Sequence, residues 1–275
     1  MKMLKIFFAL SLIFVLSNSC QKRDLQATID EVILSQQDTQ TEEVLSDVDL
    51  IVDEAVTQNA TLLKAGTTGS SPYLTSCAII TLNTKVSPQV LTIDFGTSCT
   101  GNDGKVRSGK IIVTSVAFNS FPSVRNKTFD TYIVDGKKIE GTVTKTIQKD
   151  NVNNIRTATI QEDITINLPN NEGTAHRVAN LTRQYLLNSL GVQDDNQVKT
   201  FGTVEFTRVT GIKVTKTVTS GNPLVYSASC HHMISGVVSI TTSTGHIWSV
   251  DFGNGECDNM AILTINGKSK EITIR

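Results

Sequence analysis

Apolar residues recur every three or four positions between residues 41 and 62, which is the spacing of an amphipathic helix. The apolar positions are Val44, Leu45, Val48, Ile51, Val52, Ala55 and Val56. Acidic residues lie between them, and we expect these to form the other face of the helix. They are Asp47, Asp49, Asp53 and Glu54. The pattern predicts a helix that packs on a sheet through its apolar stripe, or alternatively one that binds a partner.

Beyond the linker at 66–72, apolar and polar residues alternate, which is the period of a β-strand. Asp135-Gly136, between two such runs, is the strongest short hairpin signal of the chain. We expect 188–197 to be a polar loop. Beyond the cysteine hairpins described below, strands are expected at 110–118, 129–134, 137–147, 158–168, 174–185, 202–209, 212–218, 261–265 and 271–274. This order predicts a mainly β protein with one N-terminal amphipathic helix, in which an antiparallel meander forms a curled sheet, an open barrel or a sandwich.

Two segments of the chain repeat one design, with a cysteine at each end and a turn in the middle. Cys77 and Cys99 are centred on Pro88, and Cys230 and Cys257 are centred just before Gly245. Paired residues of a hairpin face each other across its centre, so we expect disulfides within the hairpins 77–99 and 230–257. Pairing of each cysteine with its counterpart in the other hairpin is the alternative. Zinc is disfavoured because the cysteines lack close spacing.

Each cysteine hairpin ends in an Asp-Phe-Gly sequence just before its second cysteine, at 94–96 and 251–253. We interpret both as strand-ending turns. Asp94 and Asp251 would accept hydrogen bonds from loop amides, and Gly96 and Gly253 would supply unusual backbone angles. Calcium binding at these loops is the alternative, although neither has the ordered oxygen spacing of a calcium loop.

The first 19 residues resemble a bacterial export signal, with Lys2 and Lys5 ahead of the apolar run 6–16. Small residues then precede Cys20, which predicts a lipoprotein whose Cys20 thiol carries diacylglycerol after cleavage. Acyl chains buried at about 0.8 kcal/mol per methylene would hold the protein on a membrane. Gln21 follows the cysteine, where many inner-membrane lipoproteins have Asp, so the outer membrane is favoured. Periplasmic and cell-surface orientations both stay open.

Composition and motifs argue against several functional classes. The net charge is −1, and residues 65–275 hold 20 basic and 16 acidic residues, well short of a nucleic-acid-binding footprint. The run 104–110 resembles a phosphate-binding loop, but Ile111 stands where Ser or Thr is required and a strand follows. His231 and His232 are neighbours in a strand and would point to opposite faces, so no shared metal is expected. No catalytic triad is indicated, and we expect no enzymatic activity, metal or cofactor.

The segments 92–114 and 248–273 carry a family resemblance through their Asp-Phe-Gly loops, second cysteines and following strands. With the lipobox and the acidic helical stretch, they make the chain similar to uncharacterised outer-membrane lipoproteins of Bacteroidetes over residues 20–275. The resemblance implies an outer-membrane or periplasmic lipoprotein of unknown activity and carries no catalytic residues. His231-His232 departs from the family's expected basic and aromatic pair.

Together these patterns divide the chain into a signal peptide at 1–19, a lipidated acidic tether and helix at 20–65, and a β domain at 66–275. We expect a lipid-anchored envelope protein that binds the membrane through Cys20 and acts as a binding or structural module for a protein or glycan. Carriage of an apolar ligand, such as a lipid, in a curled-sheet cavity is the alternative.

Overall fold

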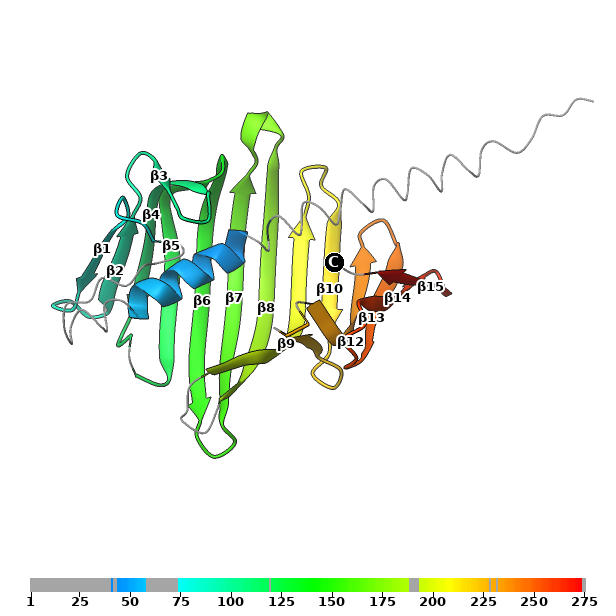
Figure 1. Ribbon diagram of the computed structural model, residues 1–275. Coiled ribbons are helices and arrows are strands. Elements are labelled where there is room, and N and C mark those ends of the chain that lie inside the picture. Colours follow the sequence, from blue (N-terminus) through cyan, green and yellow to red (C-terminus); the bar gives the residue numbers. More distant parts are fainter. Residues whose placement is uncertain are drawn as a thin grey trace, which may run out of the picture. The chain divides into compact units, whose positions relative to one another are not determined.

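Every strand of the structure, a computed structural model, belongs to one antiparallel sheet that follows the order of the chain (Figure 1). The structure describes residue 41 and residues 44–57, 74–118, 120–187, 193–227, 229–230 and 232–273. Residues 44–57 form a helix, and Pro169–Asn171 form a 3-10 turn. The strands are β1 (Ile79–Asn83), β2 (Gln89–Asp94), β3 (Cys99–Thr100), β4 (Val106–Ser115), β5 (Ser123–Val134), β6 (Lys137–Asp150), β7 (Ile155–Asn167), β8 (Thr174–Leu187), β9 (Gln193–Thr207), β10 (Lys213–Val218), β11 (Leu224–Ser227), β12 (His232–Thr242), β13 (Ile247–Asn254), β14 (Met260–Ile265) and β15 (Lys268–Thr273).

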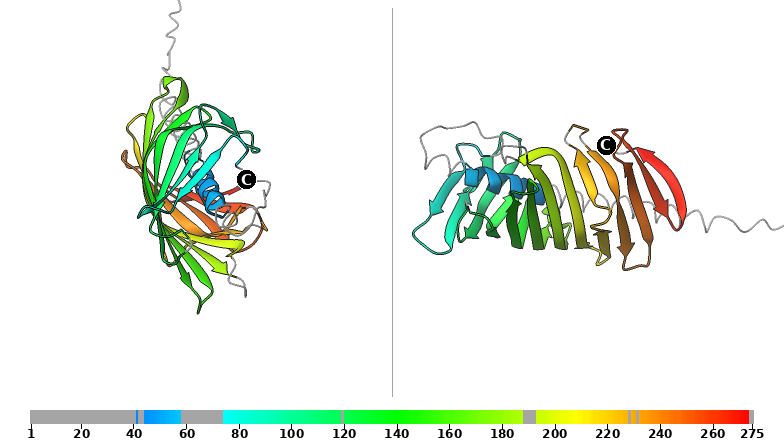
Figure 2. Two further views of the ribbon diagram at one scale, coloured as in Figure 1. Left: turned by 90° about the vertical axis from the view of Figure 1, so that its left-hand side faces the viewer. Right: turned by 90° about the horizontal axis from the view of Figure 1, so that it is seen from below.

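The mainly β meander predicted from the sequence is confirmed, and the sheet is a partial ring. Strands β1 and β15 stand at opposite ends of the strand order and do not pair with each other. Figure 2 shows the sheet curling around the helix without closing. Only two short strands lie off the path: β3 pairs with β4, while β11 pairs with both β9 and β12. Of the three architectures that the sequence left open, the fold is therefore the curled sheet.

Glycines inside long strands let the sheet curl. Gly141 in β6 and Gly202 in β9 both have positive φ, and a β-carbon on either would lie 2.1 Å from a carbonyl oxygen of the neighbouring strand. No other residue fits such an approach, and glycine kinks of this kind bend a sheet.

One row of paired residues crosses the whole sheet and defines its inner face. In order from β1 to β15 the row is Leu82, Leu91, Val113, Lys127, Val143, Glu162, Ala179, Val204, Lys216, Ile240, Trp248, Ile265 and Lys268. Residues that face each other on adjacent strands project to the same side of a sheet. Lys127 contacts Asp49 of the helix, so the inner face is the one on which the helix lies.

The helix is buried on nearly all sides. Val48, Ile51 and Ala55 are at most 1% exposed and share a core cluster with Leu91 and Ile111 of the sheet. Burying a side chain of the size of Val or Ile contributes about 1.5–3 kcal/mol. The helix therefore fills the curve of the sheet over β4–β8, as Figure 1 shows.

Two expectations about individual segments are wrong. The loop expected at 188–197 gives way to strand β9 at Gln193, which pairs with β8 as far as the Leu187–Gln193 pair. Strand β11, just before the second cysteine hairpin, was not expected because the sequence signals only a turn there. The start of β9 forms by extending its hairpin with β8, and β11 forms by pairing with both β9 and β12, so strand pairing outweighs local preference in both segments.

Candidate functional site

The structure brings together the cysteine pairs of the two hairpins. The sulfur atoms are 2.04 Å apart in Cys77–Cys99 and 2.17 Å apart in Cys230–Cys257, and both pairs are thus at disulfide distance. The geometry of the first hairpin differs from the expectation: Ile80 faces Ile93, where a hairpin centred on Pro88 would place Gly96. The chain turns after β2, so Cys99 lies in β3 beside β4. The first disulfide therefore connects the segment before β1 to β3.

The two Asp-Phe-Gly sequences form closely similar turns. The Gly96 N–H donates to Asp94 Oδ1 at 2.8 Å, and the Gly253 N–H donates to Asp251 Oδ1 at 2.9 Å. Both glycines have positive φ, at 61° and 80°. The Gly96 hydrogen bond, followed by Lys110, lowers the pKa of the Asp94 carboxyl. Among the described residues, neither aspartate belongs to a group of three side chains that could hold a metal ion.

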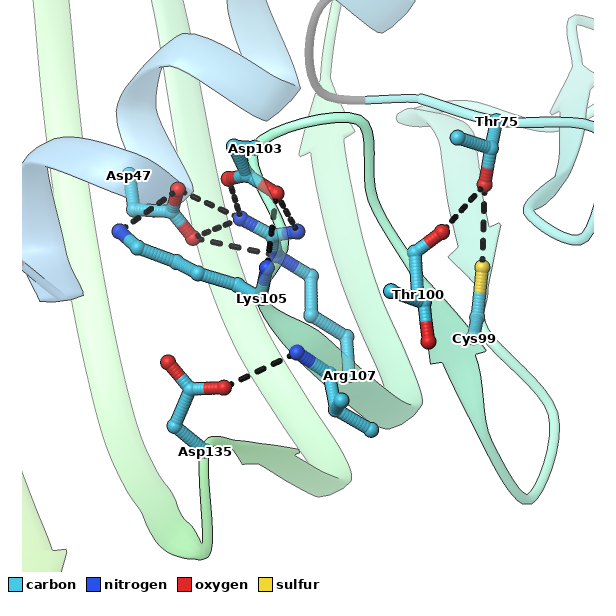
Figure 3. A network of polar contacts seen from close by, with 9 residues as sticks. Asp47, Thr75, Cys99, Thr100, Asp103, Lys105, Arg107 and Asp135 are labelled. Carbon is cyan, nitrogen blue, oxygen red and sulfur yellow. Dashed lines mark hydrogen bonds and ion pairs between the residues drawn. The ribbon is translucent and has the colours of Figure 1, made fainter.

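A buried ionic network joins the helix to the sheet (Figure 3). Asp47 accepts hydrogen bonds from Arg107 of β4, at 2.6 and 2.8 Å from Nη2 and 3.2 Å from Nε. Asp103, in the turn before β4, binds the same guanidinium at 2.6 and 3.0 Å, and Lys105 lies 3.3 Å from Asp47. Burial lowers the pKa of Arg107, but hydrogen bonds to Asp103 and Asp47 outweigh it and leave that pKa raised. Arg107 is therefore a charged group enclosed by two carboxylates.

Two further aspartates of the helix continue the network across β5 and β6. Asp49 contacts Lys127 and lies 3.3 Å from Lys145, while Asp53 lies 2.6 Å from Arg125 and 3.1 Å from Lys145. Burial raises the pKa of Asp53, but Lys145 and Arg125 outweigh this effect, so the net shift is downward.

The sequence led us to expect that the aspartates form an outer face of the helix, away from the sheet. This expectation is wrong, because the aspartates face the sheet and bind its basic residues. Asp47 is only 3% exposed, and the exposed side of the helix is narrow, consisting of Ser46, Leu50 and Thr57. The inner-face basic residues were missed, although a signal exists: Arg125, Lys127 and Phe129 share one side of β5. Basic residues spaced two apart in a strand, together with an acidic helix, indicate buried ion pairs.

The two cysteine repeats differ in how much of their inner face is covered. In the first repeat, Leu91 and Ile93 of β2 and Ile111 and Val113 of β4 are at most 1% exposed and belong to the core cluster that includes the helix. The corresponding pairs of the second repeat are Trp248–Ile265 and Val250–Leu263, of β13 and β14.

These four residues of the second repeat, Trp248, Val250, Leu263 and Ile265, are all partly exposed. We call them the open face. No described helix lies over β13 and β14 (Figure 1). The open face is thus an apolar surface at positions whose counterparts are fully covered in the first repeat.

The Gly-Lys pairs that follow each second cysteine in sequence are not equivalent in the fold. Lys110 lies within β4 and faces Asp94 of β2. Gly267, in contrast, lies in the turn between β14 and β15, and Lys268 begins β15. The loop between the hairpin and the next strand is shorter in the second repeat, which shifts the later residues along the ladder.

Three side chains near the second disulfide resemble a metal site by distance alone. Ligand atoms of Cys230, His232 and Cys257 lie within 4.8 Å of one another. The two sulfurs are at disulfide distance, and His232 Nδ1 lies 2.8 Å from the Met233 carbonyl oxygen. Paired sulfurs are not thiolate ligands, so this group is read as a histidine beside a disulfide. His231 lies outside the described residues.

Lysine residues lie on the inner face of the sheet next to the four residues of the open face. Lys216 of β10 faces Ile240, and Lys270 of β15 faces Leu263. Burial lowers the pKa of Lys216 to about 8. At the inner-face positions of the described strands β10 and β12–β15 there is no Asp or Glu. The region therefore combines apolar side chains with positive charge.

A hollow of about 290 Å³ lies near the second Asp-Phe-Gly turn and has a different chemistry. Its lining includes the acidic residues Asp251, Glu256, Asp258 and Glu271. Asp251 faces Ile262, and Ile262 faces Glu271, on the side opposite to the open face. Phe252, Met260, Ala261 and Ile262 also line the hollow, so its lining is mixed and differs from the mostly apolar lining of a site for an apolar ligand.

No protein family matches this chain, and neither a search of curated proteins nor a search of solved structures finds a similar one. The resemblance to outer-membrane lipoproteins remains a prediction from the sequence. Cys20, the predicted lipidation site, lies outside the described residues. Among the described residues, no helix has the length and apolar character needed to cross a membrane.

Proposed function

We propose that this protein is a lipid-anchored binding module of the cell envelope, and that the open face is its binding surface for a polypeptide. One observation carries the proposal. The repeat positions that are fully buried in β2 and β4, in the core cluster that includes the helix, are partly exposed in β13 and β14. Partly exposed apolar residues gathered on a sheet, with charged residues at the rim, are typical of a protein interaction site.

The membrane anchor rests on the export signal and on Cys20. A lipid tether restricts the protein to the membrane surface and raises its effective concentration toward partners held there. Such a tether suits a module that recruits or positions another envelope protein.

Carriage of an apolar ligand is the competing function. A carrier requires an enclosed apolar cavity of about 300–1,000 Å³. Here the curve of the sheet over β4–β8 is filled by the helix, and the lining of the 290 Å³ hollow includes four carboxylates beside its apolar residues. These observations favour a surface that binds a polypeptide over a cavity that holds a lipid.

The test is native mass spectrometry of the tagged protein purified from its own membrane. Trp248→Glu changes the open face, whereas Ile247→Glu changes the adjacent residue, which points to the other side of the sheet and is 60% exposed. We expect a bound polypeptide with the wild type and with Ile247→Glu, and its loss with Trp248→Glu. Circular dichroism and thermal melts must show that both variants fold. A bound polypeptide unaffected by Trp248→Glu would contradict the proposal, and a Trp248-dependent lipid would replace it with the carrier.

A further inference from the structure

The helix 44–57 shows what kind of ligand the inner face accepts. It presents apolar residues such as Val48 and Ile51 to the sheet, and its aspartates bind basic inner-face residues. The first half of the sheet is thus a surface for an acidic amphipathic helix. Helix-in-groove recognition of this kind depends on apolar anchors spaced three and four residues apart.

The second half of the inner face offers the same two chemical features. The row that passes through Leu91 and Lys127 beside the helix continues through Lys216 and Trp248 to Lys268. Apolar side chains therefore lie next to lysines in both halves. A carboxylate placed here would meet the positive charge of the exposed Lys268 and Lys270 on the inner face of β15, where the described inner-face positions of β12–β15 include no acidic residue.

The dimensions of this surface also suit a short helix. A helix of 14 residues is about 21 Å long at about 1.5 Å per residue. The neighbouring strands β10, β12, β13, β14 and β15 are separated by four gaps of about 4.8 Å each, which together span about 19 Å. Three to four helical turns could therefore contact each of these strands.

We infer that the open face binds an acidic amphipathic helix of a partner protein, seated on β12–β14 with its carboxylates toward Lys268 and Lys270. The inference rests on the proposed function and names the partner's chemistry. The binding resembles that of the protein's own helix, with apolar contacts to Trp248 and Leu263 and ion pairs at the rim. Charge complementarity of this type governs orientation and rejects basic partners.

The fluorescence of Trp248 reports directly on this binding, because Trp248 is the single tryptophan of the chain and lies in the open face. The protein is the mature chain from residue 20 with Cys20→Ser, which removes the acyl chains. The probe is a synthetic peptide with the sequence of residues 41–57, and its control has Asn in place of the three aspartates of that segment. We expect a saturable blue shift with the acidic peptide, since burial excludes water from the indole, and binding about 10-fold weaker with the control.

Charge reversal on the protein gives the matched comparison. Lys270→Glu changes the rim of the open face, whereas Lys199→Glu makes the same change on the other side of the sheet, where Lys199 faces Gln184. We expect about 3- to 10-fold weaker peptide binding for Lys270→Glu and no change for Lys199→Glu. Both lysines are exposed, so both variants should fold like the wild type.

Three results would overturn the inference. They are no response to the acidic peptide, equal binding of both peptides, and a blue shift caused by protein concentration alone, which would indicate self-association through the open face. A shift with lipid vesicles but not with peptide would instead support the carrier. If the peptide fails while a Trp248-dependent polypeptide still copurifies from membranes, the helix inference falls and the proposed function stands.

Discussion

Replacing Asp47 with alanine should destabilise the fold by about 3 kcal/mol, because it leaves the buried guanidinium of Arg107 with one carboxylate partner in place of two. The Arg107 side chain is 0% exposed and that of Asp47 is 3% exposed. Removing one partner of a buried ion pair costs about 3–5 kcal/mol. Asp103 would still bind Arg107 at 2.6 Å, which places the expected loss at the lower end of that range. At about 2–4 °C per kcal/mol for a chain of this size, Tm should fall by roughly 6–12 °C.

Urea unfolding followed by far-UV circular dichroism measures this loss, with an unchanged m-value as the sign that only stability has changed. Glu140→Ala is the matched control, because Glu140 pairs with Lys138 at 2.7 Å while both side chains are more than 40% exposed. Exposed pairs contribute less than about 1 kcal/mol. The triple variant Asp47→Leu, Asp103→Asn, Arg107→Met removes the buried guanidinium with both of its carboxylates and should recover much of the loss. If Asp47→Ala costs no more than Glu140→Ala, the ionic network does not hold the helix on the sheet.

Four further outcomes follow from the structure and the sequence. The hydrogen bond from Arg107 lowers the pKa of the Asp103 carboxyl in the folded state. The contribution of Asp103 to stability is therefore complete above about pH 4 and is lost as the pH falls through the lower, folded-state pKa. Tm measured from pH 6 to pH 2 should decline less steeply below pH 4 in Asp103→Asn than in the wild type. Ile51 is fully buried, so Ile51→Ala should lower the free energy of unfolding measured in urea by about 2–5 kcal/mol. Leu50 is 45% exposed, so Leu50→Ala should change it by less than about 0.5 kcal/mol. Equal effects would mean that the helix does not pack on the sheet as described. Cys99→Ser should lower stability by roughly 3 kcal/mol without abolishing the fold, and non-reducing peptide mapping of the wild type should find no link between the two hairpins. Metabolic labelling with an alkyne fatty acid should tag the wild type but not Cys20→Ser. Labelling that survives the substitution would contradict the prediction that Cys20 carries the membrane anchor.

The local features of the fold could be predicted because they depend on short-range chemistry. Asp135-Gly136 forms a two-residue hairpin turn in which both residues have positive φ, as its sequence predicts. The 3.6-residue spacing at 44–56 gives a helix, and the alternation from residue 110 onward gives strands. The pairing of the cysteines also follows from local chain geometry. The register of the first hairpin does not, because Cys99 lies outside the β1–β2 hairpin, in the separate strand β3.

The sequence by itself determined the class of fold, the helix, most strands and which cysteines lie together, since periodicity and turn chemistry act over a few residues. Only the tertiary structure decided that the aspartates of the helix face Arg107 and Lys145, because a carboxylate can be buried wherever a distant strand supplies a positive charge. It also decided which half of the inner face is covered. Both repeats carry similar apolar positions, and the single described helix lies on the half whose basic residues match its aspartates. Trp248 remains partly exposed for that reason, a property that depends on the position of another element and not on its own neighbours in the chain.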